Sequence, residues 1–301
     1  LIHSPDHPLA GWAGGDKLSP PLAHIACFPQ HDRINGVTLA IIPLKDTLGA
    51  RVEGIDLHKP VADAAFDLIQ QAFLDHQLLH FPGQTITSTD QISFCDRFGS
   101  ADSGFKAPGR DRPDDYRRGV MLVSNLRKDG KPIGSLPDGE MQFHSDGSHR
   151  QSPYLATTLY AIKIPGTGGD TVFADLYAAY DALSDETKAM IDDKQVLNVY
   201  YQDETHREEF EEGDALIRRA THPLAKVHPE TGRKALFVNR LMSRHIVDMP
   251  ETEGDALLAE LVDHTERPEF IYAHQWAVDD FLMWDNRCVN HARTDFPETE
   301  E

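Results

Sequence analysis

Cysteine is scarce in this chain. Its 301 residues include three cysteines, Cys27, Cys95 and Cys288, which are spaced too widely for a disulfide framework or a cysteine-rich zinc site. No segment approaches the about 18 consecutive apolar residues of a membrane-spanning helix. The first residues lack the basic and apolar regions of a signal peptide. We therefore expect a protein of the reducing cytoplasm.

Positive charge is also in short supply. The chain carries 29 lysines and arginines against 49 aspartates and glutamates, which gives a formal net charge of −20. Such a surface excludes nucleic acid and anionic membranes as partners, because both require basic patches. A small anionic ligand remains compatible with this charge, since a local arginine cluster can bind one inside an acidic protein.

No composition shift divides the chain into two domains. Residues 1–37 are rich in Pro, Gly and His and are predicted to form a loosely ordered N-terminal arm. Residues 38–301 are predicted to form one domain, which is long enough to bury a large core.

Hydrophobic periodicity predicts a mainly β domain with flanking helices. Apolar residues at helical spacing predict helices over residues 61–77, 87–98, 176–192 and 251–267, the second with Ser88 or Thr89 as its N-cap. Short apolar runs predict strands over residues 38–42, 50–55, 78–81, 141–146, 156–164, 235–239, 270–276 and 281–284. Several short strands with helices packed outside them predict a double-stranded β-helix, or jelly roll.

The candidate site begins with His144 and Asp146, two residues apart. On a strand such residues point to the same side, so both can bind one ion while Ser145 faces away. In a jelly roll, a late strand can bring His291 beside them. Two imidazoles and one carboxylate form the facial triad of non-haem Fe(II) oxygenases. Taken singly, each of the sixteen histidines is more often a surface or satisfied core residue.

Two further segments strengthen this interpretation. Gly168 and Gly169 permit a close approach of the backbone, and Thr171 then supplies a hydroxyl at the start of a strand. The run 284–287, Trp-Asp-Asn-Arg, leads into His291. In isolation the first segment is typical of an ordinary hairpin turn, and the second of a capped turn with a buried tryptophan.

These motifs resemble those of the taurine dioxygenase / 2,4-dichlorophenoxyacetate dioxygenase family of Fe(II)- and 2-oxoglutarate-dependent enzymes. The similarity runs from about residue 38 to the end of the chain. It is carried by these segments: DTLGARVEGIDL, LLHFPGQ, FHSDGS, PGTGGDTVFADLYAAYDALS, HPETGRKALFVN and WDNRCVNHART.

The resemblance implies a set of roles. His144, Asp146 and His291 would bind Fe(II), and Thr171 would hydrogen-bond the distal carboxylate of 2-oxoglutarate. O2 would drive hydroxylation of a small, anionic organic substrate with release of succinate and CO2. Candidate substrates are an aryloxyalkanoate, an alkyl sulfonate or sulfate ester, or a related carboxylate. The family pattern also places a carboxylate-binding arginine about eleven residues after His291, just past Glu301, on a further C-terminal strand.

Other positions bear on the substrate. Glu140 occupies the place of a substrate-contacting asparagine in the taurine enzyme. His149 and Arg150 follow the metal motif and either meet an anionic group or belong to a solvated loop. The segment Gly99–Asp115 and the loop before Glu140 are candidate lids. The resemblance also suggests a homo-oligomer, either a dimer or a tetramer.

Two other functions stay open at this point. A zinc-dependent hydrolase can also use two histidines and a carboxylate with an open coordination site. Against it, the chain has no identifiable general-base motif and no H-E-x-x-H helix. The second alternative is a non-catalytic jelly-roll binding protein.

Overall fold

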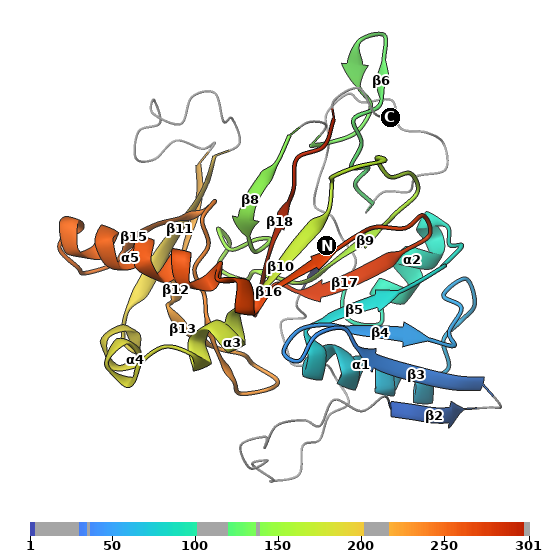
Figure 1. Ribbon diagram of the computed structural model, residues 1–301, viewed down its shortest axis with the longest axis horizontal. Helices are drawn as coiled ribbons and strands as arrows, with labels where there is room; N and C mark the ends of the chain where they lie inside the picture. The colour runs from blue at the N-terminus through green and yellow to red at the C-terminus, as the bar shows by residue number, and fades with distance from the viewer. Residues whose placement is uncertain (4–29, 35–36, 101–119, 137–138, 202–216, 298–301) are drawn as a thin grey trace.

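A seven-stranded sheet forms one wall of the molecule. The computed structural model describes residues 1–3, 30–34, 37–100, 120–136, 139–201 and 217–297 (Figure 1). All neighbouring strands in this sheet pair antiparallel except β4 and β5, which are parallel. In spatial order the strands are β1 (Ile2–His3), β9 (Tyr154–Tyr160), β17 (Phe281–Asp285), β5 (Leu78–Phe81), β4 (Ala50–Glu53), β3 (Val37–Pro43) and β2 (Gln30–Ile34).

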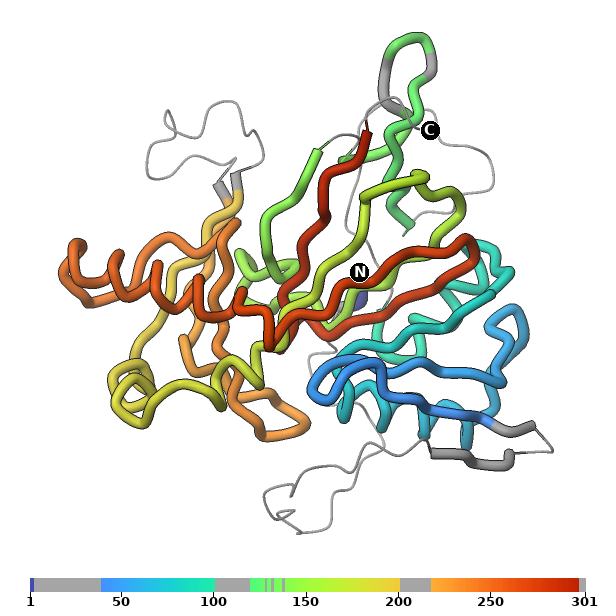
Figure 2. The backbone as a smooth tube through the Cα atoms, in the orientation of Figure 1, coloured from blue at the N-terminus to red at the C-terminus, as the bar shows by residue number. Residues whose placement is uncertain are grey.

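A four-stranded antiparallel sheet faces this wall. Its strands, in spatial order, are β16 (Ile271–His274), β10 (Thr171–Asp175), β18 (Val289–Arg293) and β8 (Met141–His144). Chain segments far apart in sequence thus lie side by side, as the tube in Figure 2 shows for β17 beside β5. The two sheets form the predicted jelly roll, and the predicted strand over residues 78–81 is confirmed to the residue.

Alternation along β17 explains how one sheet is buried on both faces. All five of its residues are buried. Phe281 and Met283 point into a cluster shared with the helices, whereas Leu282 and Trp284 point into the interior between the two sheets. Because side chains of a strand alternate between its faces, a continuous apolar run can serve two cores at once.

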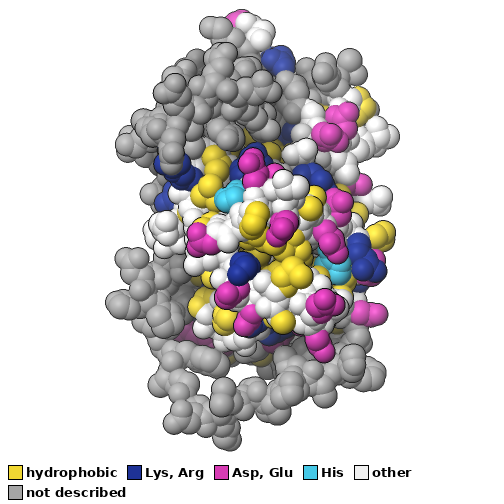
Figure 3. Space-filling model, turned by 90° about the vertical axis from the view of Figure 1, so that its left-hand side faces the viewer, with side chains coloured by type: hydrophobic (Ala, Val, Ile, Leu, Met, Phe, Trp, Pro, Cys, Tyr) yellow, Lys and Arg dark blue, Asp and Glu magenta, His cyan; other side chains and the backbone are white. Residues whose placement is uncertain are grey.

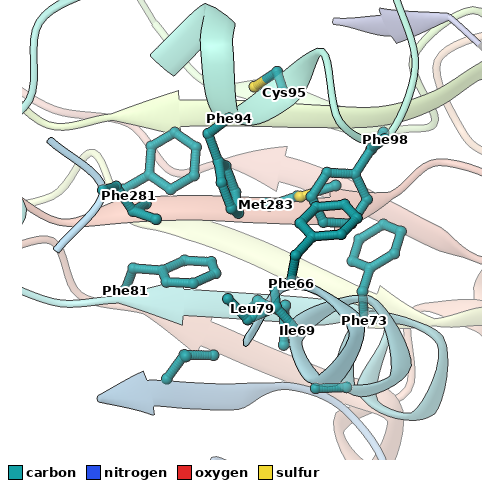
Figure 4. Packing of buried hydrophobic residues seen from close by; sticks show 14 of the residues in the cluster. Phe66, Ile69, Phe73, Leu79, Phe81, Phe94, Cys95, Phe98, Phe281 and Met283 are labelled. Carbon is teal, nitrogen blue, oxygen red and sulfur yellow. The ribbon is translucent and has the colours of Figure 1, made fainter. Parts of the chain in front are cut away.

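Helices α1 (Asp63–His76) and α2 (Ser88–Cys95) cover the outer face of the large sheet. Their aromatic rings pack against those of the strands in Figure 4, where Phe94 of α2 lies 5.6 Å from Phe81 of β5 between ring centroids. Helix α2 begins one residue after the predicted start at residue 87 and ends three residues before the predicted end at residue 98. Its N-cap is Thr87, which forms a capping box with Asp90, and the predicted caps Ser88 and Thr89 lie inside the helix.

A third layer lies beside the jelly roll, on the left in Figure 1. The layer comprises a three-stranded sheet, β12 (Ile217–Pro223), β11 (Gln195–Tyr201) and β15 (Ser243–Ile246), and a hairpin of β13 (Ala225–Val227) and β14 (Lys234–Leu236). Of its strands, β14 overlaps the strand predicted over residues 235–239, and the others were not predicted from the sequence. Helix α5 (Glu251–Thr265) packs on β15, and this side of the molecule shows hydrophobic side chains interspersed with charged ones (Figure 3).

The single helix predicted over residues 176–192 is wrong. The chain forms two helices there, α3 (Leu176–Asp181) and α4 (Asp185–Ile191). Asp175 accepts hydrogen bonds from the backbone of α3, and Ser184 accepts one from the N–H of Thr187. Ser184 therefore caps a new helix at a point where the periodic pattern alone would continue the first one.

Parts of the predicted arm and lids fall outside the described residues. Of residues 1–37, the described ones include β1 and β2, both in the large sheet, and Ile2 is buried. The candidate lid Gly99–Asp115 lies outside the described residues apart from its first two positions. The loop before Glu140 contains a small hairpin of β6 (Arg127–Lys128) and β7 (Lys131–Pro132). Among the described residues, no helix is both long and apolar enough to cross a membrane.

The glycine pair before β10 makes the close backbone approach that was predicted. Gly168 and Gly169 both have φ near +71°, and the N–H of Gly169 donates to the carbonyl oxygen of Asp295 at 3.2 Å. A Cβ on Gly168 would overlap that same oxygen. The turn therefore needs glycine at position 168 for space as well as for conformation.

Replacing Gly168 separates the need for space beside Asp295 from the need for a positive φ. We expect Gly168→Ala to lower the free energy of unfolding by about 3 kcal/mol, because backbone atoms must move. The control Gly83→Ala has a similar positive φ but open space around its Cβ, and should cost about 1 kcal/mol. Urea unfolding measures both; equal losses would contradict the role of the contact with Asp295.

Candidate metal centre

The register of three strands places the candidate residues on one face. In β18, His291 lies opposite His144 of β8 on one side and opposite Phe173 of β10 on the other. Directly opposed residues in antiparallel strands point to the same face, so all three side chains enter the interior of the jelly roll. Strand β8 ends at His144, two residues earlier than predicted, and Asp146 lies in the turn that follows.

The three side chains surround a gap. Nε2 of His144 lies 3.7 Å from Oδ1 of Asp146, and Nε2 of His291 lies 3.8 Å from Oδ2. These distances are too long for hydrogen bonds. Two ligand atoms that each lie about 2.1 Å from one ion can be at most about 4.2 Å apart, and both distances are within this limit. Two imidazoles and a carboxylate thus converge as metal ligands would, and the donor set fits Fe(II).

Backbone contacts fix which nitrogen of His144 faces the gap. Nδ1 of His144 lies 2.9 Å from the carbonyl oxygen of Gln142. A carbonyl can only accept, so Nδ1 carries the proton and the lone pair of Nε2 points toward Asp146. Ser145 faces away, as predicted, and donates to the carbonyl oxygen of Val289 at 3.0 Å and to Oδ1 of Asn290 at 2.7 Å.

The electrostatics of the gap favour the forms of Asp146 and His291 that can bind a metal. Burial raises the pKa of Asp146, but the imidazoles of His291 and His144 and the hydroxyl of Thr157 outweigh burial and hold that pKa below its ordinary value. Burial, followed by the neighbouring His144, lowers the pKa of His291 to about 3. At neutral pH the site therefore combines an ionised carboxylate with a neutral imidazole at His291.

Two residues of the Trp-Asp-Asn-Arg run contact the triad, and the other two pair with each other. The ring of Trp284 packs against His291 with centroids 4.8 Å apart. Asn286 accepts from the N–H of Asp146 at 3.3 Å. Asp285 and Arg287 form a buried ion pair, in which two guanidinium nitrogens lie 2.8 and 2.6 Å from the carboxylate oxygens. The run also forms the capped turn with a buried tryptophan that is typical of this sequence in isolation.

Sequence reasoning missed Thr157, which contacts the metal-facing carboxylate. Its hydroxyl donates to Oδ2 of Asp146 at 2.6 Å and accepts from Nδ2 of Asn286 at 2.9 Å. A single threonine inside a strand carries no sequence signal for such a role. Only the pairing of β9 with β17 brings it to the site.

Thr171 lies on the same face as the two histidines. It is buried, it pairs with Arg293 of β18, and it stands two residues before Phe173 in β10. The indole N–H of Trp276 donates to its hydroxyl oxygen at 3.0 Å. The side chain of Arg293 donates to the carbonyl oxygen of Gly139 and so ties β18 to the loop before β8.

The remaining sequence candidates lie near the metal motif. Glu140 is exposed just before β8. His149 is half-buried and its ring stacks on Tyr200 at 4.9 Å. Burial, followed by the charge of Arg150, lowers the pKa of His149 to about 4, so it is uncharged at neutral pH. The guanidinium of Arg150 lies 5.0 Å from the ring centroid of Tyr154.

Two other groups of metal-capable side chains come together within the described residues. In both, the side chains already contact one another at hydrogen-bonding or ion-pair distance. In one, the imidazoles of His80 and His274 lie 2.8 and 3.2 Å from the carboxylate of Asp280, at hydrogen-bonding distance. In the other, which includes His228 and Cys288, the carboxylate is that of Asp285 and already pairs with a guanidinium. Unlike the triad with His291, these groups satisfy one another without an ion.

Comparisons with known proteins agree with this site. A family model described as Taurine catabolism dioxygenase TauD, TfdA family matches residues 40–301. The chain is 35% identical over 273 residues to the (S)-phenoxypropionate/alpha-ketoglutarate-dioxygenase of Delftia acidovorans, a match that covers 84% of this chain and 89% of that protein. It is 33% identical over 263 residues to the alpha-ketoglutarate-dependent 2,4-dichlorophenoxyacetate dioxygenase of Cupriavidus pinatubonensis, covering 83% and 90%.

A solved structure shows the same likeness. The crystal structure of AAD-2 in complex with Mn(II) and N-oxalylglycine matches with a TM-score of 0.69 and 31% identity, over 87% of this chain and 94% of that one.

The fold and the open triad are those of a non-haem iron oxygenase. The chain belongs to the Taurine catabolism dioxygenase TauD, TfdA family. It is a 2-oxoglutarate-dependent dioxygenase that uses Fe(II), 2-oxoglutarate and O2 and acts on a small molecule. The zinc hydrolase and the non-catalytic binding protein are thereby set aside.

The environment of His222, which contacts the backbone of Arg150, predicts a pH dependence of stability. Nε2 of His222 lies 2.9 Å from the carbonyl oxygen of Arg150, and burial, followed by Lys226, lowers its pKa to about 4. As the pH falls, His222 therefore binds a proton in the unfolded chain before it does so in the folded protein. The stabilisation is fully present above about pH 6.5 and is lost as the pH falls toward 4, at about 1.4 kcal/mol per pH unit.

We expect His222→Gln to make this acid-side loss of stability shallower, because glutamine keeps a hydrogen-bond donor and does not titrate. Thermal unfolding between pH 7 and pH 4 measures the slope. Identical slopes for the wild type and His222→Gln would contradict the assignment.

Proposed function

We propose that His144, Asp146 and His291 are the Fe(II) ligands of this dioxygenase, the two histidines through Nε2. The observation that carries the proposal is the gap between them, since distances of 3.7 and 3.8 Å leave all three groups facing one another without hydrogen bonds. The neighbouring indole of Trp284 and the phenyl ring of Phe173 enclose His291 in apolar surroundings. Such walls restrict water around the bound metal.

We propose that Thr171 binds the distal carboxylate of 2-oxoglutarate. It stands two residues along β10 from Phe173, the partner of His291, which is about 7 Å along the strand and comparable to the length of a five-carbon diacid. Trp276 fills an acceptor position of the hydroxyl, so the hydroxyl hydrogen is free to be donated to an anion. The carboxylate-binding arginine implied just past Glu301 stays a prediction.

The metal and the cosubstrate carry the redox chemistry: with O2, 2-oxoglutarate is decarboxylated to succinate and CO2 and the substrate is hydroxylated. The protein supplies geometry. His144 is oriented by Gln142, and Ser145 is anchored to β18, so the turn carrying Asp146 is held against the sheet. Because all of these groups come from paired strands and one tight turn, the ligands are preorganised before metal binds.

We infer that the substrate is an aryloxyalkanoate. The support is the 35% and 33% identity to proteins named for phenoxypropionate and 2,4-dichlorophenoxyacetate, over most of both chains. A relative named alkylsulfatase, from Acinetobacter baylyi, is 26% identical, so alkyl sulfate esters belong in the same test.

A substrate panel tests both the activity and its assignment to the triad. With Fe(II), 2-oxoglutarate and O2, we expect phenoxypropionate or phenoxyacetate to stimulate succinate formation more than taurine or an alkyl sulfate does. His144→Ala and Asp146→Ala should reduce turnover at least a hundredfold while circular dichroism shows a retained fold. Turnover in both variants would contradict the ligand assignment, and stimulation by an alkyl sulfate alone would contradict the substrate.

The role of Thr171 predicts an effect on the Michaelis constant. We expect Thr171→Val to raise KM for 2-oxoglutarate about tenfold, since one charge-assisted hydrogen bond is lost. Thr171→Ser keeps the hydroxyl and should restore most of the affinity. An unchanged KM in Thr171→Val, measured by succinate release, would show that another group binds the distal carboxylate.

We propose further that the protein is a cytoplasmic homo-oligomer, a dimer or a tetramer, which has neither nucleic acid nor a membrane as partner. The support is the family resemblance, the low cysteine content and the net charge of −20. Light scattering coupled to size exclusion measures the oligomeric state directly.

A further inference from the structure

Two residues with no assigned role hold Asp146: Thr157 hydrogen-bonds its carboxylate, and Asn286 hydrogen-bonds its backbone N–H. Thr157 lies in β9 of the seven-stranded sheet, and Asn286 follows β17 in the same sheet. Asp146 follows β8 of the opposite sheet. The contacts between them therefore join the two walls of the jelly roll at the metal gap.

The direction of each hydrogen bond follows from the donors. The N–H of Asp146 can only donate, so the side-chain atom of Asn286 that it meets at 3.3 Å is the carbonyl oxygen Oδ1. The amide nitrogen of Asn286 must then face Thr157, and it donates to the hydroxyl at 2.9 Å. With that acceptor position filled, the hydroxyl hydrogen goes to Oδ2 of Asp146, 2.6 Å away.

This chain of donors treats the two carboxylate oxygens differently. Each oxygen faces an imidazole across the gap, Oδ1 that of His144 at 3.7 Å and Oδ2 that of His291 at 3.8 Å, but it is Oδ2 that accepts the short hydrogen bond from Thr157. Asn286 is fully buried, so its two contacts are shielded from competing water. A carboxylate oxygen engaged in this way is a weaker second ligand, which favours binding of the metal through Oδ1 alone.

We propose that Thr157 and Asn286 are positioning residues that hold Asp146 as a ligand with one oxygen. This inference rests on the proposed role of Asp146 as a metal ligand. A facial triad leaves three coordination positions open, which the two oxygens of 2-oxoglutarate and O2 need. A carboxylate that bound through both oxygens would occupy one of these positions. By restraining Oδ2 of Asp146, the hydroxyl of Thr157 would leave these positions available to the cosubstrate and O2.

Co(II) is the probe for the test, because its visible absorption reports both its binding and its coordination number. We expect Thr157→Val, which keeps the shape and removes the donor, to weaken Co(II) binding about tenfold or more. The absorption bands of bound Co(II) should also shift as Asp146 turns to bind through both oxygens. Thr157→Ser restores the hydroxyl and should restore both the affinity and the spectrum.

The neighbouring Thr158 provides a matched control. It lies on the opposite face of β9, where its hydroxyl contacts Gln91 at 3.2 Å and Cys95 at 3.5 Å. Thr158→Val should leave the Co(II) affinity and spectrum of the protein unchanged. If Thr157→Val does not fold, Thr157→Ala removes the same donor with less crowding and should weaken Co(II) binding in the same way.

Asp146→Ala distinguishes failure of this inference from failure of the proposed function. If Asp146→Ala loses Co(II) while Thr157→Val binds it with wild-type affinity and spectrum, the ligand assignment stands and the positioning role is wrong. If Asp146→Ala binds Co(II) as the wild type does, the ligand assignment is wrong and the positioning role is wrong with it.

Discussion

The antiparallel register of β8, β18 and β10 is the constraint on which the metal centre depends. It sets His291 opposite His144 on one side and opposite Phe173 on the other, so all three side chains share the inner face. A slip of one residue would turn His291 out of the jelly roll. The buried ion pair between Asp285 and Arg287 lies in the turn that joins β17 to β18 and fixes where β18 begins.

Spacing distinguishes the groups of metal-capable side chains in this fold. The carboxylate of Asp280 lies at hydrogen-bonding distance from two imidazoles, so the side chains of that group satisfy one another. At Asp146 the two imidazoles lie 3.7 and 3.8 Å from the carboxylate oxygens, and one of these oxygens accepts a hydrogen bond from a hydroxyl of the opposite sheet. The same residue types therefore form a stabilising contact in one place and a binding site in another, because the strands that carry them set different separations.

The sequence predicted the elements whose signal is local. The strand Leu78–Phe81, the jelly-roll class and the orientation of Ser145 away from the triad side chains all follow from alternation and apolar runs. Where a cap decides, as at Thr87 and Ser184, periodicity alone gave the wrong helix start or missed a break. Thr157 could not be found, because its role depends on β9 pairing with β17, more than a hundred residues away in sequence.

The central claim is that one metal ion binds between His144, Asp146 and His291 with the cosubstrate beside it. A crystal structure of the protein grown with Mn(II) and N-oxalylglycine tests this most directly, through the anomalous scattering of manganese. We predict one strong peak, bound by Nε2 of both histidines and by one oxygen of Asp146, with the distal carboxylate of N-oxalylglycine at the hydroxyl of Thr171. A peak at the group around Asp280 instead, or a triad without metal, would contradict the account.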